Sequence, residues 1–283
     1  MWEGNGRPPL LVSQVKMPCS TRNNANNVND ARGHQLGSVA FGRRGNKASS
    51  VVNQRKPCNL ENEDEDKTPL RIGTWNVRTM LRPGKLANVI SEMKRRKINI
   101  LGLSEVRWKE NGDFTSEGKR IIYVGGSESQ RGVAVLLDEE TAKCVISTEV
   151  HEDRIVMVRI QAQPTNIVVI QVNMPTSTHS DEEVDVVSEK LEQISQNVKG
   201  REYLIVMGDW NAVIGEQREE TCVGEFDLGR RNDRGQRLIE FCKQLKMVVT
   251  NTCFKQEKRR RYTWKAPGDT ERYQLDYIMV AKI

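Results

Sequence analysis

The chain has 283 residues, a net charge of +6 and 37% hydrophobic residues, which is enough for one large domain with a tail. Its six cysteines form no Cys-x-x-Cys pair and it has only three histidines, which argues against a zinc site or a disulfide framework. No apolar stretch approaches the roughly 18 residues of a membrane span, and the N-terminus lacks the apolar block of a signal peptide. We therefore expect a soluble, intracellular protein without a membrane partner, whose basic charge favours polyanions such as nucleic acid.

The composition changes near residue 68. Residues 1–67 are rich in Asn, Gly, Ser and Arg, show no sustained period of 2 or 3.6, and end in the acidic run "ENEDED". Such a segment buries too little apolar surface to offset the entropy lost on ordering. We predict a disordered tail over residues 1–67 and a single folded domain over residues 68–283.

The domain begins with a strand, a helix and a second strand. The run 71–77 predicts a strand, and Leu86, Val89, Ile90 and Met93 have the i, i+3, i+4, i+7 spacing of an amphipathic helix that precedes a strand at 98–106. Four strands then follow with short breaks, at 120–126, 131–138, 154–161 and 166–174, which favours antiparallel pairing.

Helices reappear in the second half of the domain. Ser180 has the side chain of an N-cap for a helix at 181–198, a strand at 203–208 follows, and a third helix is predicted at 233–246. Strands at 247–253, 260–264 and 274–280 complete the chain. Helices dispersed among many strands fit two packed sheets with helices outside.

Polar residues occur at the ends of these predicted strands, or as the single polar residue within an apolar run. Each has an alternative interpretation as a turn former, but their recurrence indicates a shared pocket. An oxygen-rich pocket with almost no histidine or thiol suits Mg²⁺ together with substrate phosphates, so the implied chemistry is phosphate-ester hydrolysis. These residues are Asn76, Glu105, Asn173, Asp209, Asn211 and Asp276.

The run "YLIVMGDWNA" at 203–212 illustrates the pattern. In an extended segment the side chains of Asp209 and Asn211 point the same way, and Trp210 points away into packing. The alternative for such a pair is an Asx turn, in which the acid bonds its own backbone.

Seven motifs, in chain order, carry a resemblance: "TWNVR", "LSEVRW", "NMPTS", "GDWNAVIG", "RRNDRGQRL", "YTW" and "LDYIMV". Their series resembles the endonuclease/exonuclease/phosphatase superfamily, and within it the endonuclease domain of non-LTR retrotransposons, over about residues 68–280. The resemblance implies an α/β fold, a four-layer α/β/β/α sandwich of two mixed sheets with outer helices and a pocket at one end. It also implies an Mg²⁺-dependent (or Mn²⁺-dependent) hydrolase acting on DNA, or on RNA, in the nucleus rather than the cytoplasm, without a small-molecule cofactor.

The resemblance also implies residue roles. Glu105 matches the metal-binding glutamate, and Asn76 matches the asparagine that helps to position the metal and the phosphate. Asp209 matches the aspartate that orients or deprotonates the attacking water, and Asn211 matches the amide that holds the phosphate. Asp276 matches the aspartate that orients a catalytic histidine.

The chain departs from the family pattern at two places. Asn173 stands where the family usually has a phosphate-contacting Tyr. The chain ends "QLDYIMVAKI", whereas the family continues through a Ser-Asp-His motif and a closing strand. A missing preorganised donor of this kind lowers a rate by about 10²- to 10³-fold, and a missing strand exposes the edge of its neighbour. His179 is the histidine nearest to a pocket element, but a solvated loop histidine is the expected interpretation.

The basic run 255–265 has two interpretations. It is either a charged, solvated sheet edge or a surface in which Arg259, Arg260 and Arg261 contact phosphates independently of sequence. We favour the second.

Three hypotheses for function remain. The first is an Mg²⁺-dependent endonuclease derived from a retroelement and impaired without Ser-Asp-His, and the second is a catalytically inactive nucleic-acid-binding or interaction module of the same fold. The third is a superfamily enzyme for lipid phosphodiesters or RNA tails, which the basic charge and the retroelement-like motifs disfavour.

Overall fold

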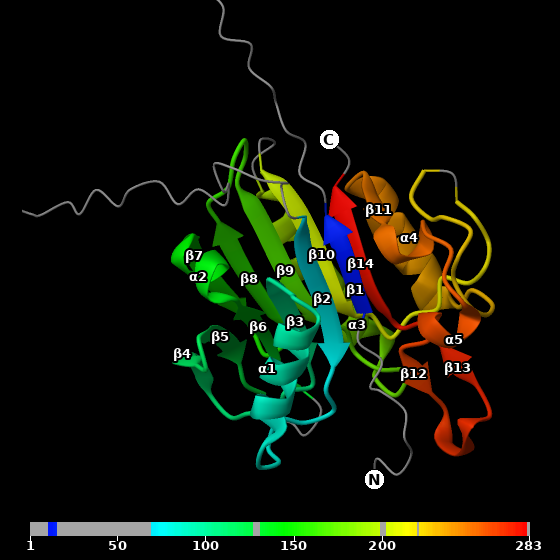
Figure 1. Cartoon of the computed structure of the whole chain (residues 1–283). Helices are drawn as coiled ribbons and strands as arrows, with labels where there is room; N and C mark the ends of the chain where they lie inside the picture. Colours follow the sequence, from blue (N-terminus) through cyan, green and yellow to red (C-terminus); the bar gives the residue numbers. More distant parts are fainter. Residues whose placement is uncertain (1–10, 16–68, 127–130, 199–201, 220, 282–283) are drawn as a thin grey trace, which may run out of the picture.

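The computed structural model describes residues 11–15, 69–126, 131–198, 202–219 and 221–281. Two six-stranded mixed sheets make up its centre (Figure 1). In spatial order, the first sheet consists of β1 (Leu11–Val15), β2 (Leu70–Asn76), β3 (Ile100–Ser104), β6 (Val133–Leu137), β5 (Lys119–Val124) and β4 (Asn111–Ser116). The second consists of β11 (Met247–Val249), β14 (Asp276–Ala281), β10 (Tyr203–Asp209), β9 (Ile167–Asn173), β8 (Ile155–Ile160) and β7 (Val145–His151).

Most neighbouring strands are antiparallel, as the row of successive strands predicted. The parallel pairs are β2 with β3 and β9 with β10. A separate hairpin pairs β12 (Trp264–Lys265) with β13 (Arg272–Tyr273). The two mixed sheets confirm the predicted fold class.

The helices are α1 (Lys85–Arg95), α2 (Glu139–Lys143), α3 (Asp181–Gln196), α4 (Asp233–Gln244) and α5 (Lys258–Arg261). The predicted stripe of α1 packs against the first sheet, where Val89, Ile90 and Met93 are fully buried. Helices α3 and α4 cover the second sheet in the same way. A third cluster of buried aliphatic side chains joins the two sheets. Burial of each such side chain stabilises the folded state by about 1.5–3 kcal/mol. The three apolar clusters therefore hold the layers together.

Helix α3 begins where the sequence predicts. The Ser180 side chain accepts a hydrogen bond from the Glu183 backbone N–H, and three acidic residues occupy the first turn. Acidic side chains there interact favourably with the positive end of the helix dipole. The predicted stripe is buried at Val184, Val187 and Leu191.

Three sequence predictions of structure are wrong. Residues 247–253 were predicted as one strand, whereas β11 ends at Val249 and Thr250–Thr252 form a 3₁₀ helix. Residues 260–264 were predicted as a strand, whereas 258–261 form α5 and the strand begins only at Trp264. Residues 11–15 were predicted to be part of an unpacked tail, whereas they form β1, which pairs antiparallel with β2 from Leu11 opposite Thr74 to Val15 opposite Leu70. Without β1, the edge of β2 would leave backbone N–H and C=O groups unpaired. Hydrogen bonds to these groups stabilise residues 11–15 as a strand, although the surrounding sequence is polar. The rest of the predicted tail lies outside the described residues.

A glycine allows β9 and β10, two of the strands that carry the site, to lie close together. Gly208 has φ 153°, and a Cβ there would lie 1.9 Å from the Val172 carbonyl oxygen. Only a residue without a side chain fits this position. Gly208 therefore brings β10 against β9 one residue before Asp209.

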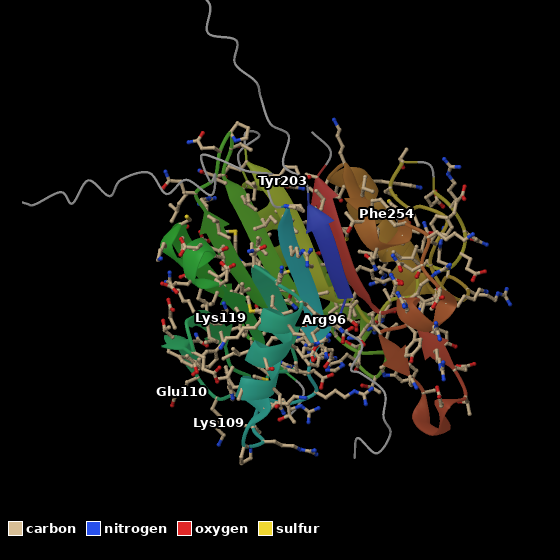
Figure 2. All side chains as sticks on the ribbon, viewed as in Figure 1. Arg96, Lys109, Glu110, Lys119, Tyr203 and Phe254 are labelled. Carbon is tan, nitrogen blue, oxygen red and sulfur yellow. The ribbon has the colours of Figure 1, made fainter. Side chains whose placement is uncertain are left out.

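The ends of the central strands meet at one end of the molecule. Tyr203, at the start of β10, lies at the upper end in Figure 2, and Lys109 and Glu110, which follow Glu105, lie at the lower end. The arrow of β2 points to this lower end, where α5 and the β12–β13 hairpin also lie (Figure 1). The polar residues that follow β2, β3, β9 and β10 are thus delivered to the same end.

Candidate active site

The centre of the site is one amide that bridges two carboxylates. The side-chain nitrogen of Asn76, at the end of β2, donates to Glu105 Oε1 at 2.8 Å and to Asp209 Oδ2 at 2.6 Å. Asn76 Oδ1 accepts the Arg78 backbone N–H at 2.9 Å, which fixes the orientation of the amide. Residues separated by up to 133 positions in the chain therefore meet as the strand-end pattern predicts.

A third carboxylate lies beside the first two. Asp276, the first residue of β14, is paired with Asp209 across the antiparallel ladder. Both side chains are almost fully buried, and burial raises the pKa of Asp209 to about 6, with the charge of Glu105 adding to the rise. Burial first, and then the charge of Asp209, raises the pKa of Asp276. Three acids at one desolvated place repel one another, so the site favours a cation or a proton.

The two predicted amides lie next to these acids. Asn173 is in register with Asp209 on the neighbouring strand β9. Asn211 donates through its side-chain nitrogen to the Met174 carbonyl at 2.8 Å, and its backbone N–H donates to Asp209 Oδ1 at 3.1 Å. The second bond is the Asx turn that the sequence left open, so Asp209 serves both a local turn and the shared site. Trp210 packs against Phe241 with ring centroids 5.5 Å apart, as predicted.

Several non-glycine residues of the described chain have a left-handed backbone conformation, and four of them lie at the site. Arg78, Glu105, Arg107 and Asn211 all have positive φ, between 47° and 59°. Such conformations are uncommon for residues with a side chain and concentrate at functional sites. These conformations set the direction of the chain at the end of β3 and in the turn after β10.

Two arginines and a threonine complete the site, and the sequence analysis assigned them no role. Arg107 pairs with Glu105 at 2.7 Å, and the charge of Arg78 lowers the pKa of both Asp209 and Asp276 against the stronger effect of burial. The Thr263 hydroxyl accepts the Asp276 backbone N–H at 3.2 Å. The available signal was an arginine two residues after each strand-end residue, in "NVR" and "EVR".

The donor set fits a hard divalent cation. Asp276 Oδ1 is buried and has no hydrogen-bond partner among the described residues, as expected of an atom that faces a bound group. Among the described residues, no group of three or more His, Cys, Asp and Glu side chains is placed to hold a metal ion without further ligands. Mg²⁺ commonly takes one or two carboxylates and completes its octahedron with waters and phosphate oxygens. Glu105 is the partly exposed carboxylate suited to this role, whereas Asn76 turns its nitrogen toward the acids, and its role at a metal stays a prediction.

Both ring nitrogens of His179 have partners among the described residues. Its Nδ1 lies 2.8 Å from the Thr176 hydroxyl and its Nε2 lies 3.4 Å from Arg154 Nη2. Because a guanidinium only donates, Nε2 is the acceptor of this pair and Nδ1 carries the proton. Both ring nitrogens are therefore engaged, which argues against His179 as a substitute for the family histidine.

The three arginines of the basic run differ in environment. Arg259 and Arg260 are exposed on α5, and among the described residues their acidic partner is Glu257, which is also exposed. Arg261 is half-buried, donates to the backbone carbonyls of Gln256 and Asp227, and lies over the Phe226 ring at 5.6 Å. Arg259 and Arg260 are thus available to a partner, whereas Arg261 stabilises the local fold.

A buried acid holds the turn that carries Asn211. Asp227 Oδ2 accepts the Gly215 backbone N–H at 3.1 Å and the Tyr277 hydroxyl at 3.0 Å. The Tyr277 oxygen in turn lies 3.3 Å from the Ile214 backbone nitrogen, which donates to it. Burial raises the pKa of Asp227 to about 7, although these hydrogen bonds oppose the rise.

Replacing Asp227 with asparagine is expected to flatten the pH dependence of stability. A carboxyl with a raised pKa binds more protons in the folded than in the unfolded state between about pH 4 and 7, so stability falls as pH rises through this window. Because asparagine does not titrate, the variant should exceed the native chain in free energy of unfolding at pH 8, by on the order of 1–2 kcal/mol. Urea unfolding at pH 5, 6, 7 and 8 measures this, with Asp185→Asn as the exposed control. Parallel curves for the native chain and Asp227→Asn would contradict it.

Comparison with known proteins agrees with this geometry. Residues 73–282 match the model of the Endonuclease/Exonuclease/phosphatase family. Craniofacial development protein 2 of Bos taurus is 42% identical over 209 residues, which are 74% of this chain and 35% of that protein. The same protein of Tragulus javanicus is 40% identical over 209 residues, 74% of this chain and 36% of its own length. The chain thus spans about a third of the length of these curated relatives.

Solved structures share the fold at low sequence identity. The endonuclease domain of TRAS1, a telomere-specific non-LTR retrotransposon, superposes with a TM-score of 0.51 at 16% identity, covering 76% of this chain and 86% of that domain. The 3′ phosphatase NExo from Neisseria, bound to product DNA hairpin, gives 0.55 at 15% identity over 74% of this chain and 86% of that one. At such identities the likeness concerns the fold alone. In the described part of the chain, no helix has the length and apolarity to cross a membrane. With the sandwich, the strand-end acids and a family match over most of its length, the chain belongs to the endonuclease/exonuclease/phosphatase family.

Proposed function

We propose that the domain is an Mg²⁺-dependent endonuclease that hydrolyses DNA phosphodiesters, derived from a retroelement, and that residues 1–283 alone have weak activity because they contain no Ser-Asp-His after Asp276. The observation that carries the proposal is the meeting of Glu105, Asp209 and Asp276 around the Asn76 amide. The deeply buried pair of acids, Asp209 and Asp276, supports a cation at this place.

Each side chain of the site has its own role in the proposed hydrolysis. Asp209, with a pKa of about 6, is ionised at neutral pH yet basic enough to accept a proton from the attacking water. Asn76 holds Asp209 and Glu105 in fixed positions, and the amide of Asn211 and the side chain of Asn173 would hold the phosphate. When bound at Glu105, Mg²⁺ would supply charge stabilisation to the phosphoryl oxygens.

DNA is the substrate that the surface favours. The net charge of +6 and the exposed Arg259 and Arg260 suit a polyanion. Two solved structures of the same fold are a retrotransposon endonuclease domain and a phosphatase bound to product DNA hairpin. A DNA substrate also accords with a nuclear location.

The second candidate is a nucleic-acid-binding module without catalysis. Asn173 in place of the family tyrosine favours it. The two candidates are separated by incubating supercoiled plasmid with the chain in Mg²⁺ or in EDTA. Slow Mg²⁺-dependent nicking that Glu105→Ala removes supports the enzyme, whereas DNA binding with no metal-dependent nicking, even with a Ser-Asp-His extension, supports the binding module.

Arg259→Ala with Arg260→Ala is expected to weaken DNA binding uniformly across sequences. Each lost phosphate contact should lower the slope of log K against log [salt] by about 1. Fluorescence anisotropy of labelled duplexes between 50 and 200 mM salt, roughly the range over which such contacts change affinity, measures the slope. Lys143→Ala, on α2, is the matched control. An unchanged slope in the double variant would place the DNA elsewhere on the surface.

A further inference from the structure

A groove separates helices α3 and α4 on the outer side of the second sheet. Its volume is about 350 Å³, within the usual range for ligand pockets and sufficient for one or two large side chains. The floor is apolar and joins the core beneath the candidate active site. It consists of Val184, Leu191, Trp210, Leu238 and Phe241.

The rim of this groove is acidic in a chain that is basic as a whole. Asp185, Glu189, Glu192 and Glu240 line it together with Arg234 and Arg237. Arg237 is committed to Asp185 at 2.6 Å. Arg234 donates to the backbone carbonyls of Pro175 and His179.

Among the described residues, no lysine or arginine pairs with three of the rim glutamates. Glu192 and Glu240 accept only from the neutral amides of Gln244 and Gln236, and no lysine or arginine of the described residues pairs with Glu189. The rim therefore repels nucleic acid and attracts a positively charged partner.

Trp210 supplies a specific contact at the floor. The side chain is 5% exposed, and its indole N–H has no acceptor within the described residues. A buried donor of this kind costs free energy unless a partner accepts from it. A large apolar side chain that enters the groove would pack against Trp210 between α3 and α4.

We propose that this groove binds a basic peptide segment of a partner protein, with a large apolar side chain seated against Trp210 and lysine or arginine side chains paired with Glu189, Glu192 and Glu240. Two helices that present an apolar floor and a charged rim are a common way to receive a short peptide. The site is independent of the proposed hydrolysis, but Trp210 lies between Asp209 and Asn211, so the occupant binds beside the catalytic turn.

Anisotropy with a fluorescein-labelled octapeptide of sequence KLLKKLLK tests the proposal. The native 283-residue chain should bind it saturably, and an EELLEELL peptide should not bind. Glu189→Lys with Glu240→Lys should weaken binding at least tenfold, which corresponds to about 1.4 kcal/mol. Ser188→Trp, at a half-buried groove position whose hydroxyl only bonds its own helix, should weaken it as much by filling the groove. Glu139→Lys with Glu140→Lys, on the exposed helix α2, is the matched charge control and should bind as the native chain does.

Circular dichroism establishes that each variant is folded before it is compared. Absence of saturable binding to the native chain overturns the proposal. Equal binding by the rim variant and the α2 control overturns it as well, since general acidity would then explain the affinity. Binding that survives Ser188→Trp overturns the seating of an apolar side chain in the groove.

Discussion

Replacing Asp209 with asparagine is expected to lower Mg²⁺-dependent DNA cleavage by about 10³-fold, within the range attributed to a positioned general base. Asparagine has the same shape but a single side-chain oxygen, so it keeps either the hydrogen bond from Asn76 or the one from the Asn211 N–H. Circular dichroism of the variant shows that it is folded, so that the loss can be assigned to kcat. The measurement is the single-turnover cleavage rate of a chain extended beyond Ile283 with a family-like Ser-Asp-His segment, because that chain gives the larger signal.

Asp185→Asn is the control for this variant, since Asp185 is an exposed acid of α3 that pairs with Arg237. DNA affinity should change little in either protein. A rate for Asp209→Asn within tenfold of the native rate would remove Asp209 from the proton transfer.

The second large effect concerns the extension itself. Adding a family-like segment with Ser-Asp-His after Ile283 is expected to raise Mg²⁺-dependent nicking of supercoiled plasmid by about 10²- to 10³-fold. The physical reason is at Asp276, whose buried Oδ1 has no partner among the described residues and is free to accept an imidazole N–H. The imidazole would then stabilise charge at the phosphate.

A Ser-Asp-Ala segment of equal length is the matched control, because it adds the same backbone without the imidazole. Equal activity of the two extended chains would show that strand completion, and not the histidine, limits the rate. Brisk nicking by the unextended chain that Glu105→Ala abolishes would show that another residue replaces the histidine. His179→Ala would then be the first variant to measure, despite the engagement of both its ring nitrogens.

The sequence predicted the buried elements well because their periodicity is strong. The stripe of α1 and the fully buried, mostly apolar run of β9 admit one interpretation each. The elements it did not predict are polar or exposed. β4 reads "NGDFTS" and is mostly exposed, and β7 is an edge strand with several exposed residues. Pairing with a neighbour, and not local propensity, makes these segments strands.

The residues of the candidate site also fall into some that the sequence predicted and some that it did not. The meeting of Asn76, Glu105 and Asp209 followed from strand ends, because parallel strands deliver their ends to one edge. Arg78 and Arg107 were not predicted, although each lies two residues after a strand-end residue, because lysine and arginine are common in a chain that has 44 of them. Their place depends on the left-handed turns after β2 and β3.

The most direct test of the central claim, that these acids form one metal-dependent hydrolytic site, is Mn²⁺ binding followed by electron paramagnetic resonance. Mn²⁺ takes the same oxygen ligands as Mg²⁺ and reports binding without any need for catalysis. The account predicts one Mn²⁺ site in the native chain whose affinity falls at least tenfold, about 1.4 kcal/mol, in Glu105→Gln and is unchanged in Glu189→Gln. Equal Mn²⁺ affinity in the native chain and Glu105→Gln would contradict it.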